Sequence, residues 1–192
     1  EMLAGVSHDL RTPLTRIKLQ TSMLKDNKLK NELHSDITEM TAMLDSYLSF
    51  ARGEISDPIE KINFKLMLKD IINNLKSNNK DIELLIKNEA ETSGRPAQLK
   101  RCFVNIIENA KRYGDVIKIT LKKNDDDIII NIEDNGHGIK KENFNDVFRP
   151  FFTLDKSRNK ETGGSGLGMT ISRDIIRSHG GDIILNKSQL GI

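Results

Sequence analysis

The 192-residue sequence has little of several features that would point to particular classes of protein. It holds one cysteine, Cys102, which excludes an intramolecular disulfide and a cysteine-rich zinc site and fits a reducing compartment. It holds no tryptophan and only 5% aromatic residues, so we expect no large aromatic core. No run of about 18 apolar residues occurs, so no segment of this sequence is a candidate for a membrane-spanning helix.

Neither sign of charge dominates the composition. Lysine and arginine number 30 against 28 acidic residues, which gives a formal net charge of +2. A nucleic-acid-binding or basic membrane-binding protein would carry a strong positive excess, so the composition supports neither class. The length and a charged fraction of 30% indicate one or two small, charge-rich domains. The sequence opens in mid-pattern at residues 1–4, as a piece of a longer protein would.

Residues 1–53 predict an antiparallel pair of amphipathic helices, separated by the polar stretch 25–31. Two helices alone cannot bury both of their apolar seams, so we expect a second copy to complete a four-helix bundle as a homodimer. Residues 54–60, which include Pro58, interrupt the helical pattern and predict a linker. The apolar residues with heptad-like spacing include Leu3, Leu10, Ile17, Leu24, Leu33, Ile37, Met40, Leu44, Tyr47 and Ala51.

Residues 61–192 predict a second domain that mixes helices with antiparallel strands. The spacing of apolar residues predicts helices over 64–75, 96–110 and about 167–178. Alternating or clustered apolar residues predict strands over 82–87, 116–123, 128–133 and 182–185. This content favours an α+β sandwich with one helical layer on one sheet.

His8 is the first residue that could carry chemistry. A lone surface histidine usually has no function, but here Pro13 lies inside the predicted helix, at a cost of about 3 kcal/mol that a purely structural helix would avoid. A neutral imidazole can act as a nucleophile through one nitrogen if a carboxylate holds the proton on the other, and Asp9 is placed to do so. Thr12 follows one helical turn later, on the same face as His8.

Two asparagines one turn apart, Asn105 and Asn109, are the second candidate, with Arg112 three residues further on. Asparagine is mildly unfavourable in the middle of a helix. Either both side chains are exposed, or their amide oxygens face a pocket, where they would suit Mg²⁺ that keeps water and phosphate oxygens as its other ligands.

Two loops with several glycines complete the set of candidates. Residues 134–139 (Asp-Asn-Gly-His-Gly-Ile) follow a predicted strand and could form an ordinary turn. Residues 163–168 open a predicted helix and could form either a phosphate cradle or a flexible hinge, although they lack the ending of a P-loop. Between the loops, the aromatic residues within 148–152 could belong to the core, but the polar run 153–162 favours a lid over a ligand.

In this order, the segments resemble the five sequence boxes of sensor histidine kinases. Residues 6–14 are similar to the H box, 105–113 to the N box, 134–139 to the G1 box, 148–152 to the F box and 164–168 to the G2 box. Within the family, the H box and residues 109–114 most resemble the osmosensor kinases that control porin expression. The resemblance implies a dimerisation and histidine-phosphotransfer hairpin, followed by a Bergerat-type (GHKL) ATP-binding domain that covers residues 61–192.

The resemblance also implies the reaction. His8 would take the γ-phosphoryl group of ATP, with Asp9 orienting the imidazole and accepting its proton. The phosphoryl group would pass to an aspartate of a response regulator, and Thr12 would position water when the hairpin dephosphorylates that regulator. Asn109 would bind Mg²⁺, with Asn105 on the same helix face. We expect no direct nucleic-acid partner, and we expect the chain to be the cytoplasmic portion of a bacterial inner-membrane protein.

A nucleotide-binding role is implied for further residues. Arg112 and Tyr113 would contact phosphate and nucleoside, and Asp134 would accept a hydrogen bond from the adenine amino group. The full set with implied contacts to the nucleotide is Asn105, Asn109, Ala110, Lys111, Arg112, Tyr113, Asp134, Gly136, Gly138, Ile139, Phe152, Thr153, Gly164, Ser165, Gly166, Leu167 and Gly168.

Two departures from the family pattern leave an alternative open. Thr153 stands where many relatives have an arginine, and Lys156, Arg158 or Lys160 would have to replace it. The sequence stops where a last strand should begin, which would leave a sheet edge exposed. The alternative is a degenerate kinase that dimerises and binds a regulator. A Bergerat-fold ATPase of the chaperone or topoisomerase kind is disfavoured, because it would need no exposed histidine on a bundle.

Overall fold

The computed structural model describes residues 2–24, 26–75, 81–125, 127–154, 166–188 and 190, and for residues 2–11, 39, 42–43 and 45–56 it describes the backbone alone. The chain divides into two compact units. The first comprises residues 1–56 and 153–167, and the second comprises residues 57–152 and 168–192. None of the helices in the described ranges is long and apolar enough to span a membrane.

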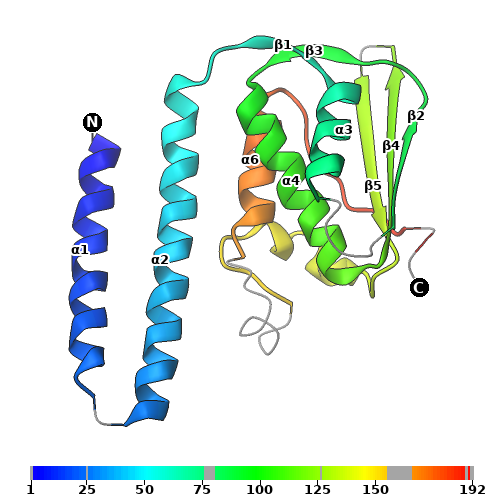
Figure 1. Ribbon diagram of the computed structural model, residues 1–192. Coiled ribbons are helices and arrows are strands. Elements are labelled where there is room, and N and C mark those ends of the chain that lie inside the picture. Colours follow the sequence, from blue (N-terminus) through cyan, green and yellow to red (C-terminus); the bar gives the residue numbers. More distant parts are fainter. Residues whose placement is uncertain are drawn as a thin grey trace. The chain divides into compact units, whose positions relative to one another are not determined.

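The first unit contains the predicted helical hairpin, formed by α1 (Met2–Ser22) and α2 (Asn27–Ser56), the blue and cyan helices of Figure 1. The second helix begins at Asn27, within the stretch predicted as the break, because Asp26 caps it. The Oδ1 atom of Asp26 accepts hydrogen bonds from the backbone N–H groups of Lys28 (2.9 Å) and Leu29 (3.2 Å). An aspartate before the first helical residue is the sequence signal that would have located this start.

The second helix ends three residues later than its predicted end at Gly53. A glycine within a helix costs only about 1 kcal/mol, which packing readily offsets. The stronger stop is Pro58, because a proline ring disfavours helical backbone in the residue before it, here Asp57. The domain limits themselves stay a prediction.

A short two-stranded ribbon opens the second unit. Strand β1 (Glu60–Asn63) pairs antiparallel with β3 (Glu91–Gly94), with Glu60 opposite Gly94. The sequence pattern predicted neither strand, because each has four mainly polar residues and so shows no alternation. The ribbon places Asn63 at the start of α3 (Phe64–Leu75), where its Oδ1 atom accepts from the backbone N–H of Leu66 at 3.1 Å.

The main sheet has the strand order β2 (Asp81–Ile86), β4 (Val116–Asn124), β5 (Asp127–Asp134). Strands β4 and β5 form the predicted antiparallel hairpin, but β2 runs parallel to β4, where antiparallel strands were expected. The reason is the helix α4 (Pro96–Tyr113) between them, since a helical crossover returns the chain to the same end of the sheet.

Helices α3, α4 and α6 (Gly168–Ser178) form one layer, and the three-stranded sheet forms the other (Figure 1). We call this second unit the sandwich. Pro96 occupies the first turn of α4, as predicted. The rings of Phe64 and Phe103 meet edge to face, with centroids 5.9 Å apart. Core side chains at the helical and strand spacing predicted from the sequence include Leu68, Ile71, Leu99, Ile107, Ile117, Ile119, Leu121 and Ile175.

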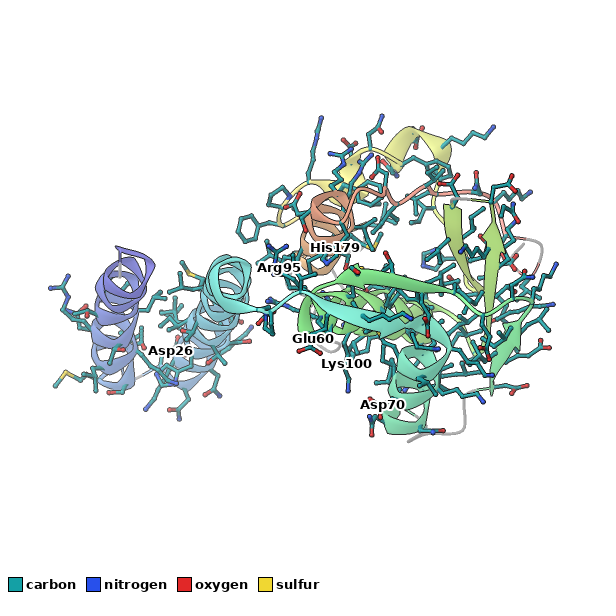
Figure 2. All side chains as sticks on the ribbon, turned by 90° about the horizontal axis from the view of Figure 1, so that it is seen from above. Asp26, Glu60, Asp70, Arg95, Lys100 and His179 are labelled. Carbon is teal, nitrogen blue, oxygen red and sulfur yellow. The ribbon has the colours of Figure 1, made fainter. Side chains whose placement is uncertain are left out.

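Helices α4 and α6 are joined at their ends and along their length. The backbone N–H of Arg95, just before α4, donates to Nε2 of His179 at 3.0 Å (Figure 2), so Nδ1 of that ring carries its proton and donates to the carbonyl of Ile175 at 2.7 Å. Midway, the Ser172 hydroxyl donates to the Cys102 carbonyl at 3.4 Å. Burial raises the pKa of the Cys102 thiol to about 12, so this thiol stays neutral.

The strand predicted over 182–185 is absent from the described segment 181–188. The alternation behind that prediction is real, since Ile183 and Leu185 are half-buried and Ile184 is 77% exposed. Alternation alone does not make a strand, because a strand also needs a backbone partner. Among the described residues, β5 is the last strand on its side of the sheet.

Candidate functional site

The loop after β5 is tied to the residues that follow α4. The Oδ1 atom of Asn135 accepts from the backbone N–H groups of Asp115 (2.8 Å) and Val116 (3.0 Å). In return, the backbone N–H of Asn135 donates to the Val116 carbonyl at 3.2 Å. No role was predicted for Asn135, although an asparagine at the end of a strand is a signal for such side-chain-to-backbone bonding. These bonds place the loop 134–139 beside the C-terminal end of α4.

Two glycines of this loop are needed for different reasons. A Cβ atom on Gly136 would lie 2.7 Å from the carbonyl oxygen of Tyr113 and 2.8 Å from Oδ1 of Asp134, so only glycine permits this close approach. Gly138 has open space around it but a φ of +69°, a backbone conformation that favours glycine. A loop with two such constraints is more specialised than an ordinary turn.

The side chains beside these glycines converge on the same place. The backbone N–H of Gly136 donates to Oδ1 of Asp134 at 2.9 Å, which fixes the carboxylate at the end of β5. The ring of Tyr113 meets that of His137 edge to face, with centroids 5.3 Å apart. The Nδ1–H of His137 donates to the Gly138 carbonyl at 2.9 Å. The structure therefore brings the end of one predicted motif, Tyr113, against another, residues 134–138.

One of the two asparagines of α4, Asn105, lies next to the start of α6. Asn105 and Asn109 are half-buried, which is not the full exposure that a purely structural interpretation requires. A Cβ atom on Gly168 would lie 3.9 Å from Cβ and Cγ of Asn105. The first residue of α6 therefore lies next to the asparagine face of α4. Arg112, at the end of α4, is exposed.

Two residues of α4 that were predicted to bind the nucleotide have structural contacts. Ala110 is 6% exposed and belongs to the core. The Nζ atom of Lys111 donates to the carbonyl of Leu75 at 2.6 Å, at the C-terminal end of α3. Residues two apart on a helix do not share a face, so Lys111 points away from Asn109.

The start of α6 has the properties of an anion site. Gly166 has a φ of +66°, Leu167 is buried, and Gly168 begins the helix. The first N–H groups of a helix have no partner within it and carry the positive end of its dipole. Gly164 and Ser165, the other predicted residues of this loop, lie outside the described residues.

The F-box segment begins at Phe148, the last residue of the 3₁₀ turn η2 (Asp146–Phe148), which follows another such turn, η1 (Lys141–Asn143). Phe151 has a φ of +65° and is 60% exposed, so it is a strained surface residue and not part of the core. Phe152 and Thr153 are half-buried. The basic residues considered as replacements for an arginine at position 153 lie outside the described residues, as does most of the predicted lid.

The predicted phosphoacceptor segment lies in α1. Its backbone is helical through His8 and Asp9, whose side chains lie outside the described residues, so the predicted exposure of His8 is not tested. The helix continues through Pro13 to Ser22. Thr12 is exposed, as its predicted position opposite the apolar seam requires.

Comparison with protein families decides between the classes that this geometry allows. Residues 94–191, more than half of the chain, match the histidine kinase-, DNA gyrase B- and HSP90-like ATPase family. The chain belongs to this ATPase family. Residues 1–55 match the His Kinase A (phospho-acceptor) domain, so an ATP-binding domain follows a histidine phosphoacceptor domain, as in protein-histidine kinases. The match confirms the predicted GHKL architecture and the resemblance to sensor histidine kinases.

Relatives match across nearly the whole chain. The sensor protein kinase WalK of Staphylococcus aureus is 32% identical over 206 residues, which is 97% of this chain and 34% of that protein. The sensor histidine kinase GtrS of Pseudomonas aeruginosa is 28% identical over 192 residues, 100% of this chain and 40% of that protein. The chain thus spans less than half the length of these relatives. The closer resemblance to porin-regulating osmosensor kinases stays a prediction.

Solved structures show the same fold. Full-length ShkA in complex with AMPPNP superimposes with a TM-score of 0.66 at 18% identity, over 94% of this chain and 41% of that one. The histidine kinase AdeS of Acinetobacter baumannii gives a TM-score of 0.59 at 23% identity, over 89% of this chain and 86% of that one. These likenesses extend across the hairpin and the sandwich.

Proposed function

We propose that this histidine kinase chain transfers the γ-phosphoryl group of ATP to His8 and passes it to an aspartate of a response regulator. One observation carries the proposal. In the sandwich, α4 lies against the G1 loop through Tyr113 and Gly136, and against the first residue of α6 through Asn105 and Gly168. Parts of three sequence motifs thus meet on one helix, which supports a single nucleotide site in a domain that follows, in sequence, one that matches histidine phosphoacceptors.

The adenine end of the site lies at Asp134. Its Oδ1 atom accepts a hydrogen bond from the Gly136 N–H. This bond orients Oδ2 to accept a hydrogen bond from the adenine amino group. Gly136 keeps the loop close to α4, while Gly138 and Ile139 shape the base pocket. The half-exposed ring of Tyr113 contacts the nucleoside, and its edge-to-face packing on His137 fixes its orientation.

The phosphate end of the site lies at the start of α6. Backbone N–H groups of residues 164–168 and the guanidinium of Arg112 bind the phosphate oxygens, while Phe152 and Thr153 lead into the lid. Asn109 holds Mg²⁺ through its amide oxygen, beside Asn105. The donor suits this ion, because an amide oxygen is a hard neutral ligand, Asn109 is half-buried, and Mg²⁺ commonly keeps water and phosphate oxygens as its other ligands. When bound, Mg²⁺ neutralises charge on the phosphate oxygens.

The phosphoacceptor chemistry is that of a neutral imidazole. The unprotonated nitrogen of His8 attacks the γ-phosphorus, an N–P bond forms, and the bond to the bridging oxygen of ADP breaks. Asp9 holds the other ring nitrogen in position and accepts its proton. The phosphoryl group then moves to the carboxylate of the regulator.

The hairpin has two further proposed roles. The exposed hydroxyl of Thr12 positions water for dephosphorylation of the regulator. The hairpin also forms a homodimer, and within the full-length protein the chain is the cytoplasmic part of a bacterial inner-membrane kinase. Support for the dimer comes from apolar residues of the predicted seams that are exposed in the single copy, namely Ile17, Leu24 and Met40.

Labelling with radioactive ATP and Mg²⁺ tests the proposal. We expect acid-labile, alkali-stable phosphate on the chain, no label on His8→Ala, and full label on the matched control His34→Gln in α2. Undiminished label on His8→Ala would contradict the assignment, and an unlabelled wild-type chain would contradict the kinase reaction. A chain that binds ATP but takes up no label would instead favour the degenerate kinase. This is the second candidate, because Thr153 stands where many relatives have an arginine. ATP hydrolysis at many turnovers, unaffected by His8→Ala, would favour an ATPase of the chaperone kind.

A further inference from the structure

The F-box segment is fastened to α6 by two contacts. The hydroxyl of Thr170 donates to the carbonyl of Phe148 at 2.9 Å. One turn later, the guanidinium carbon of Arg173 lies 4.3 Å from the centroid of the Phe148 ring. Thr170 and Arg173 are three residues apart and therefore share one face of the helix. The same helix begins at Gly168, so these contacts connect the F box to the proposed phosphate site.

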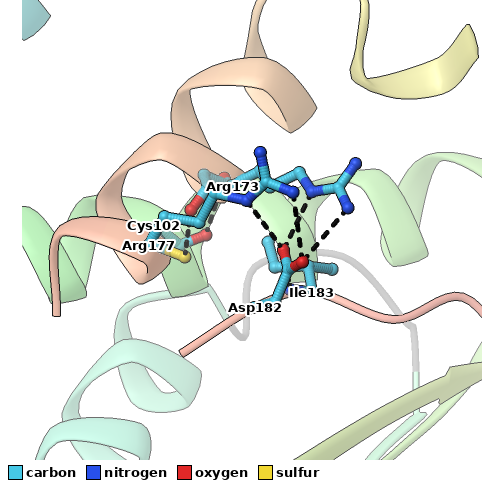
Figure 3. Close-up of polar contacts among 6 residues, drawn as sticks. Cys102, Arg173, Arg177, Asp182 and Ile183 are labelled. Carbon is cyan, nitrogen blue, oxygen red and sulfur yellow. Dashed lines mark hydrogen bonds and ion pairs between the residues drawn. The ribbon is translucent and has the colours of Figure 1, made fainter. Parts of the chain in front are cut away.

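Arg173 is held from its other side by Asp182, which follows α6 (Figure 3). Its Nε and Nη2 atoms donate to Oδ1 and Oδ2 of Asp182 at 2.8 and 3.2 Å, a bidentate pair. Arg177 donates to the same two oxygens at 3.3 and 3.2 Å, and the backbone N–H of Ile183 donates to Oδ1 at 2.8 Å. The hydrogen bonds from Arg173 and then Arg177 hold the pKa of the Asp182 carboxyl far below its usual range.

The two arginines differ in what else they contact. The side chain of Arg173 is 23% exposed and lies over Phe148, whereas that of Arg177 is 53% exposed and its described side-chain contacts go to Asp182. A guanidinium can donate in its own plane while its face stacks on an aromatic ring, which an ammonium cannot do. Arg173 therefore bridges Asp182 and Phe148, and Arg177 serves as an internal control on the same carboxylate.

We propose that Arg173 is a positioning residue for phosphoryl transfer, which holds Phe148 and the F-box segment in register with the phosphate-binding start of α6. This inference rests on the proposed kinase function. When a segment of a binding site shifts by about 1 Å, the site binds ATP and transfers its phosphoryl group less well, although the domain stays folded. A merely structural ion pair would instead show equal effects for the two arginines.

Autophosphorylation kinetics of the whole chain separate these possibilities. We expect Arg173→Met to raise the KM for Mg·ATP by about tenfold, which corresponds to the loss of one good contact. The matched variant Arg177→Met should change KM by less than about twofold, with a comparable shift in the thermal midpoint. Arg173→Lys, which keeps the charge, should restore only part of the affinity. Equal KM values for Arg173→Met and Arg177→Met would overturn the proposal.

A second measurement does not depend on the kinase reaction. The chain has no tryptophan, so Phe148→Trp introduces a single tryptophan next to Arg173, whose fluorescence can be excited apart from that of the two tyrosines. We expect Arg173→Met in this background to increase acrylamide quenching, and Arg177→Met to leave it unchanged. Quenching that does not respond to Arg173→Met overturns the positioning role. A wild-type chain without phosphorylation but with the expected quenching would refute the proposed function and leave the contact to Phe148 established.

Discussion

The hairpin and the sandwich bury their apolar residues to different degrees. In the sandwich, Leu68, Ile107 and Ile117 are completely buried. In the hairpin, Ile37 is the one buried apolar side chain among those that are described, while Leu19 and Met40 are 64% and 54% exposed. The sandwich therefore carries its own core, whereas we propose that a second copy completes the core of the hairpin. On the proposed function, the nucleotide site is built within one chain, while the surroundings of the phosphoacceptor helix depend on assembly.

The largest expected effect comes from the core of the sandwich. Ile107→Ala removes a fully buried side chain of α4, and we expect it to destabilise the sandwich by about 2–5 kcal/mol. Calorimetry should show a shift of the sandwich transition and an unchanged hairpin transition. Leu66→Ala, at a position that is 64% exposed on α3, is the control and should change little. Equal shifts of both transitions would show that the two units do not fold separately.

Two glycines of the proposed nucleotide site separate the effect of steric crowding from that of backbone strain. Gly136→Ala would place a Cβ atom 2.7 Å from the Tyr113 carbonyl, so the loop must move, at a cost of about 1–3 kcal/mol and most of the ATP affinity. Gly138→Ala meets open space and costs only the strain of its positive φ, about 1–2 kcal/mol, with a smaller loss of affinity. Titration calorimetry with a non-hydrolysable ATP analogue measures both. If Gly138→Ala lost more ATP affinity than Gly136→Ala, the approach of Gly136 to the Tyr113 carbonyl would not be what the nucleotide site needs.

A substitution at Met40 tests whether the hairpin dimerises through its apolar seam. Met40→Lys puts a charge into the proposed dimer seam, and we expect it to weaken dimerisation by at least about tenfold, or 1.4 kcal/mol. Met23→Lys, at the turn and 84% exposed, is the matched control. Sedimentation at a series of dilutions gives the two dissociation constants. Unchanged dimerisation of Met40→Lys would show that the seam lies on another face.

The smallest expected effect concerns the ion pairs of Asp182. Its pKa is lowered in the folded state, chiefly by Arg173, so its stabilisation is present above the ordinary aspartate pKa of about 3.9 and is lost as the pH falls through the lower folded value. Asp182→Asn should lower the thermal midpoint slightly and constantly between about pH 6 and pH 8. The difference should shrink below about pH 4. If the difference in thermal midpoint between the wild type and Asp182→Asn grew as the pH fell, the ionised carboxylate would not be the stabilising form.

The sequence revealed most of the helices and motifs because those depend on local spacing. Helix α4 was predicted from its apolar period and from Pro96, and both hold in the structure. The motifs could be found by their residue types, but their convergence could not, because Tyr113 meets Gly136 only after β4 and β5 form the sheet. Asp26 as a helix cap was within reach of sequence reasoning and was missed.

The remaining differences depend on contacts between distant residues. The parallel pairing of β2 and β4 follows from the path of α4 across the sheet and leaves no trace in the alternation of either strand. The predicted strand over 182–185 had the right alternation, but Asp182 instead anchors the chain to Arg173. Arg173 belongs to no motif, and its role became visible only when the structure placed it over Phe148.

In the proposed reaction, one histidine of the hairpin receives phosphate from the nucleotide held by the sandwich. Mass spectrometry of peptides, prepared at neutral to alkaline pH after incubation with Mg·ATP, locates that phosphate directly. We expect a single phosphorylated residue, His8. Phosphate on another histidine, or on a serine or threonine with His8 unmodified, would contradict it.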